Sequence, residues 1–422
     1  MSALNSILGI VVLLLIAFAL SNNRKAISLR TVFGALFLQI GIGAIILYWE
    51  TGRQALLAIA EGVSKVISYG NDGINFLFGG LVSDKMFEVF GGGGFVFALK
   101  VLPPIIFFSS LISVLYYLGI MQMVIRILGG ALQKLLGTSK PESMSAAANI
   151  FVGQTEAPLL VRPYIKSMIN SELFAVMSGG LASVAGAVMI GYAGMGVPLP
   201  YLIAASFMAA PGGLLFAKIL HPQLETFKDE LSADDMDDKP ANVIEAAAVG
   251  AFSGMQLAMN VGAMLLAFIA LIALFNGFVG WIGALAGFEG LTLQMLFGYI
   301  SQPLAWLIGV PWGGEAQIAG SLIGQKLIVN EFVAYADFVN YLKPEAGVAL
   351  SPKTIAIITF SLCGFANLSS IAILIGGLGG MAPSRRSDVA RMGIKAVMAG
   401  TLSNLMSAAI AGLFIGIGGA VM

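Results

Sequence analysis

The sequence predicts an all-α membrane protein with eight transmembrane helices and two re-entrant helical hairpins. Of its 422 residues, 58% are hydrophobic and only 10% are charged, whereas a soluble domain carries about a quarter charged residues. Several segments reach the roughly 20 apolar residues that a helix needs to cross a bilayer. Two pairs of apolar segments interrupted by Gly or Pro also resemble each other, which indicates an internal repeat.

The spans and hairpins follow from the apolar segments in chain order. The eight predicted spans are 4–22, 29–49, 94–118, 172–194, 200–219, 243–275, 353–380 and 393–420. The two predicted hairpins are 141–169 and 292–341. The amphipathic segments 53–92 and 121–137 are typical of interfacial helices, and the polar stretch 222–242 is typical of a solvent loop.

The first apolar segment, Ile7 to Leu20, has the length of a signal-peptide core. A signal peptide carries positive charge before that core. Here no Lys or Arg precedes Ile7, and Arg24, Lys25 and Arg30 follow the apolar run. We therefore expect a retained membrane helix.

The Lys and Arg residues predict an orientation in a bacterial inner membrane. If the N-terminus lies outside and both hairpins return to the side they entered, fifteen of the 22 Lys and Arg residues fall inside. Cytoplasmic loops carry such an excess of Lys and Arg. Both termini are therefore predicted to face the periplasm.

Charge and residue counts exclude several functions. The net charge of zero gives no sign of nucleic-acid binding. A single cysteine, Cys363, and a single histidine, His221, exclude disulfide frameworks and Cys/His metal sites. No His-Glu-x-x-His string and no nucleophile–base pair is present, so an intramembrane enzyme is disfavoured.

An internal repeat indicates where a solute would bind. Residues 179–186 align without gaps with residues 363–370, and the hairpin tips 152–158 and 310–316 precede them. In the predicted orientation the two copies run in opposite directions. This is the pattern of an inverted repeat, hairpin 1 with spans 4–5 against hairpin 2 with spans 7–8, whose substrate site lies near the membrane midplane.

The repeat predicts one transporter unit over residues 1–422 with two kinds of parts. Residues 141–219 form transport repeat 1 and residues 292–420 form transport repeat 2. Residues 1–49, 94–118 and 243–275 supply scaffold-type spans.

Two glutamates are the main candidates for solute binding, because a carboxylate at membrane depth is costly and marks a substrate or ion path. Glu156 follows Gln154 and Thr155 at the first tip, and this trio suits a neutral ligand rich in hydrogen-bonding groups, such as a purine or pyrimidine edge. Glu156 could instead only cap a half-helix. Glu331 could instead lie at the water interface, since Asn330 and Asp337 are near it. Glu315 is expected to support the second tip.

The breaks in spans four and seven carry further polar candidates. Asn367 and Ser370 are three residues apart, so they are predicted to share a helical face. They could bond substrate hydroxyls or bridge neighbouring helices, and Phe365 could stack on a ring. For sodium, Asn149 and Ser183 offer side-chain oxygens, and the carbonyls of Val152 and Val184 would be free if the helices end there.

Three strings in this order carry a resemblance to a known family: Gly153-Gln154-Thr155-Glu156-Ala157-Pro158, Asn330-Glu331-Phe332-Val333-Ala334-Tyr335, and Cys363-Gly364-Phe365-Ala366-Asn367-Leu368-Ser369-Ser370. With them, the chain resembles the bacterial concentrative nucleoside transporters over nearly its whole length. The resemblance implies a homotrimer of eight-span subunits, each with a scaffold and a transport domain that moves like an elevator.

The resemblance also implies roles for individual residues. Gln154, Thr155 and Glu156 would face the nucleobase, with Val188 packing on it. Glu331, Asn367 and Ser370 would bond the ribose hydroxyls, with Phe365 beside them. The residues that match the sodium positions of sodium-coupled members are Asn149, Val152, Ser183 and Val184.

The expected function is import of nucleosides such as uridine, with Na+ as the coupling ion. The alternative with the same fold is a proton-coupled nucleoside symporter that uses Glu156 or Glu331 as the proton carrier. An ion or water channel is the alternative from another class. A channel would need neither the paired hairpins nor Glu331.

Overall fold

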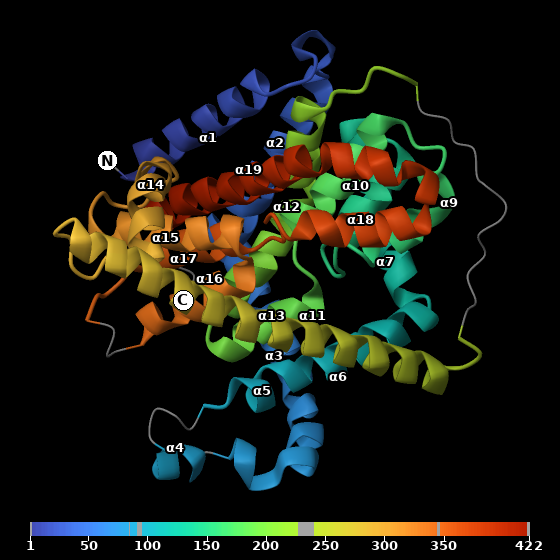
Figure 1. The fold of residues 1–422 in the computed structure, drawn as a ribbon. Coiled ribbons are helices and arrows are strands. Elements are labelled where there is room, and N and C mark those ends of the chain that lie inside the picture. The colour runs from blue at the N-terminus through green and yellow to red at the C-terminus, as the bar shows by residue number, and fades with distance from the viewer. Residues whose placement is uncertain (1, 84, 91–94, 227–239, 344–346, 420–422) are drawn as a thin grey trace.

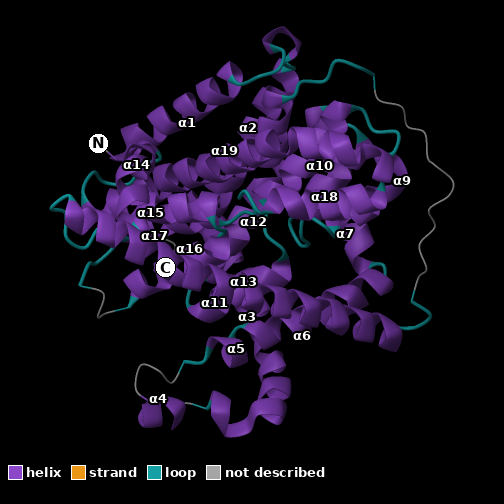
Figure 2. Cartoon of the chain, viewed as in Figure 1, coloured by secondary structure: helices purple, strands orange, loops and turns teal. Residues whose placement is uncertain are grey.

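The computed structural model describes residues 2–83, 85–90, 95–226, 240–343 and 347–419, and every regular element in these ranges is helical (Figures 1 and 2). The all-α prediction is therefore confirmed for the described residues. Most of the predicted solvent loop 222–242, the start of the predicted third span and the end of the predicted eighth span lie outside them.

The first third of the chain forms the outer helices. They are α1 (Ser2–Ala19), α2 (Leu29–Gly43) with a π-helical extension (Ala44–Tyr48), α3 (Glu50–Phe78), α4 (Lys85–Phe90), α5 (Phe97–Lys100), α6 (Leu102–Tyr117) and α7 (Ile120–Leu136). The helices α3 and α7 cover most of the two amphipathic segments that the sequence predicts to be interfacial.

The segments predicted as the first hairpin and as the fourth and fifth spans follow. They comprise α8 (Lys140–Ala148), a 3-10 helix (Ala157–Val161), α9 (Arg162–Ile165), α10 (Asn170–Ala182) and α11 (Gly186–Met195), and then α12 (Leu199–Leu220). The predicted break in span four lies at residues 183–185. The half-helix expected to follow Glu156 is a 3-10 helix, Ala157–Val161, and one α-helical turn, α9.

The second half of the chain contains the longest helices. They are α13 (Val243–Leu285), α14 (Leu293–Leu307), α15 (Gly314–Ile328), α16 (Glu331–Phe338), α17 (Pro352–Leu362), α18 (Ser370–Met381) and α19 (Arg386–Gly418). The predicted end of span six at residue 275 is wrong. The helix α13 continues to Leu285. The polar side chain of Asn276 within it is paired, because its Nδ2 donates to Gln294 at 2.9 Å and its Oδ1 accepts from the backbone N–H of Leu293 at 2.8 Å.

Local sequence sets several helix starts. Ser139 accepts a hydrogen bond from the N–H of Glu142, and the Glu142 carboxylate accepts one from the N–H of Ser139. This capping box satisfies backbone donors that a helix start leaves free. Asn330 caps α16 by accepting from the N–H of Val333 at 2.9 Å, and Ser351 caps α17 with Pro352 at its first position.

Burial divides the helices into a central and a peripheral group. Among the described residues, six helical segments are long and apolar enough to cross a membrane. The most apolar window of the segment Asn170–Met195 is 100% buried, and that of α12 is 94% buried, against 17% for α13. The helices α10, α12 and α19 therefore form the core, and α6 and α13 pack against each other along its outside (Figure 1).

Glycine allows the central helices to approach closely. A Cβ atom on Gly213 of α12 would lie 3.0 Å from the Cα of Gly179 in α10. Small residues at such contacts let helix backbones pack in a bilayer, where no hydrophobic effect drives helices together.

Candidate functional site

The breaks of the two interrupted helices meet in the buried interior. The N–H of Phe365, between α17 and α18, donates to the carbonyl of Ser183, between α10 and α11, at 3.1 Å. Asn404 of α19 donates from its side-chain amide to the carbonyls of Ala182 at 2.6 Å and Cys363 at 2.9 Å. Backbone groups freed at the breaks are therefore satisfied within the protein, as a bilayer requires.

The tip of the first hairpin joins this crossing. The N–H of Gly186 donates to the carbonyl of Phe151 at 2.9 Å. A Cβ atom on Gly180 would lie 2.9 Å from the Cβ of Gln154. The tip therefore packs directly on the break of the fourth span.

One cavity at this meeting point is lined by all eight residues that the sequence singles out for substrate. They come from the first tip, from α11, from the start of α16 and from the break before α18, and they are Gln154, Thr155, Glu156, Val188, Glu331, Phe365, Asn367 and Ser370. Segments more than 200 residues apart in the chain thus contribute to one site.

Glu331 lies in this cavity and not at the water interface, because its side chain is only 4% exposed. Its Oε1 accepts a hydrogen bond from the hydroxyl of Tyr192 at 3.0 Å. Its Oε2 accepts one from the Nδ2 of Asn367 at 3.0 Å. Each carboxylate oxygen has further lone pairs, so the group can also accept from ligand hydroxyls.

Asn367 and Ser370 are arranged differently from the prediction. Asn367 does not share a helical face with Ser370, because it lies in the break that precedes α18. Its Oδ1 accepts from the backbone N–H of Ser370 at 2.9 Å and from the hydroxyl of Ser369 at 2.7 Å. Asn367 thereby satisfies a free donor at the start of α18 and orients its Nδ2 toward Glu331.

The opposite wall of the cavity is formed by the first tip. The Nε2 of Gln154 donates to the hydroxyl of Ser370 at 3.4 Å. The Oε1 of Gln154 is buried and has no hydrogen-bond partner in the part of the chain that the structure describes. An unpaired buried acceptor is costly, so this atom is placed to accept a hydrogen bond from a ligand.

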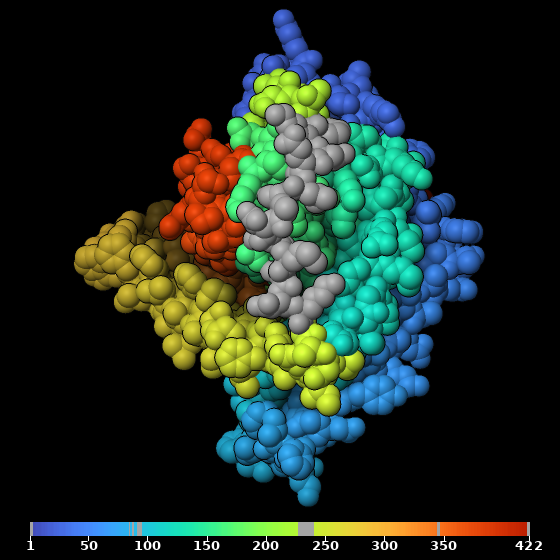
Figure 3. All heavy atoms as spheres, turned by 90° about the vertical axis from the view of Figure 1, so that its right-hand side faces the viewer, coloured from blue at the N-terminus to red at the C-terminus, as the bar shows by residue number. Residues whose placement is uncertain are grey.

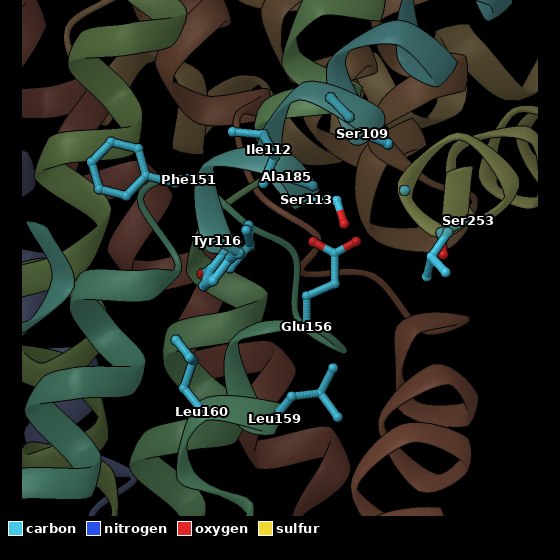
Figure 4. Close-up of a pocket in the computed structure, with 14 residues that line it drawn as sticks. Ser109, Ile112, Ser113, Tyr116, Phe151, Glu156, Leu159, Leu160, Ala185 and Ser253 are labelled. Carbon is cyan, nitrogen blue, oxygen red and sulfur yellow. The ribbon is translucent and has the colours of Figure 1, made fainter. Parts of the chain in front are cut away.

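Glu156 both supports the tip and faces two cavities. Its Oε2 accepts from the N–H of Gly153 at 3.0 Å, which closes the turn. The carboxylate also lines a neighbouring cavity between the hairpin, α6 and α13, where it points toward Ser113, with Tyr116 and Ser253 nearby (Figure 4). The alternative that Glu156 caps the following half-helix is wrong, because its carboxylate bonds the preceding Gly153 and makes no capping hydrogen bond to the helical turn that begins at Ala157.

Two of the residues predicted to hold sodium, Asn149 and Ser183, lie against Gly179 of α10. Asn149 is 2% exposed, and neither of its side-chain polar atoms has a hydrogen-bond partner among the described residues. A Cβ atom on Gly179 would lie 3.3 Å from its Nδ2. The hydroxyl of Ser183 donates to the carbonyl of the same Gly179 at 3.2 Å.

This arrangement fits a small monovalent cation. Val184 is 0% exposed and lies in the break after α10, and Val152 is 4% exposed in the turn after α8. The Asn149 amide oxygen, the Ser183 hydroxyl and backbone carbonyls are neutral oxygen ligands, the type that a hard cation takes.

Several residues of the site escape prediction from the sequence. Tyr192 does not line the cavity but donates to the Glu331 carboxylate, and a hydroxyl inside the apolar, glycine-rich segment 186–195 is the sequence signal for it. Leu257, Val261 and Met264 of α13 also line the cavity. These apolar residues carry no signal, because nothing in an apolar helix marks which side faces a site.

The second tip shows the supporting role expected for Glu315. Its Oε2 accepts from the hydroxyl of Ser351 at 2.7 Å, next to the start of α17. Gly313 has a φ of 126°, a conformation that favours glycine, where the chain turns into α15.

Three family models match successive parts of the chain. The model described as "Na+ dependent nucleoside transporter N-terminus" matches residues 8–81, "Nucleoside recognition" matches residues 98–199, and "Na+ dependent nucleoside transporter C-terminus" matches residues 201–412.

Relatives and solved structures are similar over the full length. An "Uncharacterized transporter" of Haemophilus influenzae is 68% identical over 422 residues, with 100% of each chain covered. The "Nucleoside permease NupC" of Helicobacter pylori is 56% identical over 416 residues, with 99% of each covered. The structure of CNTnw in an inward-facing substrate-bound state has a TM-score of 0.96 and 66% identity, with 100% of this chain and 99% of that chain covered.

Proposed function

Because this chain belongs to the Na+-dependent nucleoside transporter family, we propose that it is a sodium-driven symporter that imports nucleosides such as uridine across the bacterial inner membrane. It is a multi-pass membrane transporter and not an enzyme. The observation that carries the proposal is one cavity that is lined by Gln154, Thr155 and Glu156 from the first tip and by Glu331, Asn367 and Ser370 from the second half of the chain.

The two walls of the cavity suit the two halves of a nucleoside. Glu331 and Asn367 supply acceptor and donor groups for the ribose hydroxyls, with Ser370 between the walls and Phe365 beside them. The first tip supplies Gln154, Thr155 and Glu156 for the nucleobase edge, with Val188 packing on its face. A site built from buried polar groups discriminates strongly against ligands that lack the matching groups.

Sodium would act by holding the first tip against the break of the fourth span. A bound sodium ion supplies positive charge to oxygen atoms that have lost water. Asn149 brings one such atom from the end of α8 and Ser183 brings another from the end of α10, with the carbonyls of Val152 and Val184 completing the set. Ion binding would therefore order the tip that carries Gln154.

The proposed architecture is eight spans, two re-entrant hairpins and an inverted repeat. The six long apolar segments, α1 and the interrupted α17–α18 together make eight. The transport repeats 141–219 and 292–420 contain the buried helices, and the spans in 1–49, 94–118 and 243–275 belong to the scaffold. The large exposed surface of α6 and α13 is suited to lipid and to the contacts of a homotrimer, along which the transport domain would move as an elevator.

The orientation with both termini in the periplasm is supported by one polar end of the molecule. There, Arg385 before α19 bonds the carbonyl of Met168 and the side chain of Asn170. Lys395 bonds Asn22, which in turn bonds His221 at 2.7 Å. Figure 3 shows the red start of α19 beside the green α9–α10 region at this end. Two of the basic residues expected in the cytoplasm, Arg385 and Lys395, thus contact this same end of the molecule.

Uptake of labelled uridine by proteoliposomes tests the function and its coupling ion. We expect saturable uptake that an inward sodium gradient accelerates at least tenfold over choline. Equal uptake with a proton gradient and no sodium would support the proton-coupled alternative and overturn sodium coupling. Uptake that does not saturate would support a channel.

Substrate analogues test the ribose wall. Uridine lacking its 2′- and 3′-hydroxyls should bind about 1–3 kcal/mol more weakly for each buried group left unpaired. Inhibition constants against labelled uridine uptake measure this, with a change at the uracil 5-position as the matched control. Equal inhibition by uridine and uracil would contradict the ribose assignment.

A further inference from the structure

A buried Lys–Asn pair lies where the two helix breaks meet. Lys326, near the end of α15, is 2% exposed, and its Nζ donates to the carbonyl of Ser361 at 2.8 Å and to the Oδ1 of Asn404 at 2.6 Å. Asn404 of α19 is also 2% exposed. Neither residue lines the substrate cavity, and neither is one of the proposed sodium ligands.

Asn404 connects the break between α10 and α11, which contains the proposed sodium ligand Ser183, to the break between α17 and α18, which contains Phe365. Its single amide nitrogen donates to the carbonyl of Ala182 at 2.6 Å and to that of Cys363 at 2.9 Å. Ala182 immediately precedes Ser183, a proposed sodium ligand. Cys363 begins the segment that carries Phe365 and leads to the start of α18.

The helix α19 packs so closely against the two breaks that neither break has much freedom to move alone. A Cβ atom on Gly364 would lie 2.2 Å from the Oδ1 of Asn404, so only glycine admits the amide there. A Cβ atom on Gly400, one turn earlier in α19, would lie 2.9 Å from Leu181. Interiors packed this closely transmit displacement.

Lys326 sets the orientation of the Asn404 amide. Because Lys326 donates to Oδ1, the Nδ2 group must point toward the two carbonyls. Lys326 also belongs to the second hairpin and lies five residues before Glu331, whose carboxylate faces the proposed ribose site. A lysine buried in a membrane protein is costly and marks a functional position. Other helices of this protein pack closely without buried charge, as Gly213 does on Gly179.

We propose that Lys326 and Asn404 are positioning residues that couple sodium binding to nucleoside binding. Sodium at Ser183 orders the end of α10, and Asn404 transmits that order through the Ala182 and Cys363 carbonyls to the segment that places Phe365. This inference rests on the proposed sodium-nucleoside symport. Coupling is reciprocal, so sodium raises nucleoside affinity by the same factor as nucleoside raises sodium affinity.

The test compares the uridine affinity of the purified full-length protein with and without sodium. We expect wild type to bind uridine at least tenfold more tightly in sodium than in choline. Asn404→Asp keeps the acceptor for Lys326 and the shape of the side chain but removes both donors to the carbonyls. We expect it to reduce the sodium effect to less than twofold, and Lys326→Met to do the same.

Ser407→Ala is the matched control. Ser407 lies one turn after Asn404 on α19, is buried, and accepts from the Nε2 of Gln39 at 2.9 Å instead of contacting a break. Ser407→Ala should keep the tenfold sodium effect. Lys326→Arg should keep more of the sodium effect than Lys326→Met does. If Asn404 had only a structural role, Asn404→Asp would weaken uridine binding equally in sodium and in choline, and the ratio of the two affinities would stay unchanged. That result would overturn the proposal. A sodium effect absent from wild type would overturn the proposed sodium coupling itself.

Discussion

Glu331→Gln is expected to lower uridine affinity about 100-fold. Both oxygens of Glu331 accept hydrogen bonds, from Tyr192 and from Asn367. Glutamine replaces one of these acceptors with an amide nitrogen that faces a donor, and it removes the charge that strengthens bonds to ribose hydroxyls. Hydrogen bonds to charged groups contribute about 1.5–3 kcal/mol each, and about 1.4 kcal/mol is a factor of ten in affinity.

Tyr192→Phe is the matched control for Glu331→Gln. It removes one donor to the same carboxylate but keeps the charge and the aromatic packing on Phe332 and Tyr335. We expect only a two- to tenfold loss of uridine affinity, because Tyr192 orients the carboxylate and is not proposed to contact uridine. Uridine binding to purified protein measures both variants, and thermal unfolding verifies that each is folded. Unchanged affinity in folded Glu331→Gln would exclude a ribose contact.

Asn149→Ala is expected to raise the sodium concentration for half-maximal uridine uptake at least tenfold. The Asn149 side chain is buried without a partner among the described residues, so a bound ion would be its natural partner. Removing one oxygen ligand costs more than an ordinary hydrogen bond, because the ion has lost water to enter the site. Maximal uptake should be approached again when sodium is raised.

Ser143→Ala is the matched control for Asn149→Ala, and Ser183→Ala tests a second proposed sodium ligand. Ser143→Ala removes a buried hydroxyl from the same helix, α8, but that hydroxyl already donates to the carbonyl of Ser139 at 2.9 Å. It should leave the sodium dependence unchanged. Ser183→Ala should raise the half-maximal sodium concentration less than Asn149→Ala, because the Ser183 hydroxyl already bonds Gly179. A normal sodium dependence in both Asn149→Ala and Ser183→Ala would rule out this ion site.

Features encoded by local composition were predictable. Hydropathy indicated the membrane class, and glycine and small polar residues marked the breaks near Ser183 and Asn367, because such segments form weak helices. The three strings around Glu156, Glu331 and Asn367 indicated the nucleoside transporter family, which the family models and full-length relatives confirm.

Features set by contacts between distant segments were not predictable. The partners of Asn276 lie at the start of α14, beyond the end of α13. Asn367 lies in the break before α18, so the helical spacing rule failed for Asn367 and Ser370. Glu331 was equally compatible with a buried site and a water interface, because its neighbours in sequence are polar.

By itself the sequence determined that the chain is helical, lies in a membrane, breaks at defined points and resembles nucleoside transporters. Only the tertiary structure decided that the two breaks meet, that Tyr192 and Asn367 hold Glu331, and that Asn404, bonded by Lys326, joins the two breaks. The physical reason is that helix formation and helix breaking depend on neighbouring residues. Which side chains meet depends on the packing of helices that lie far apart in the chain.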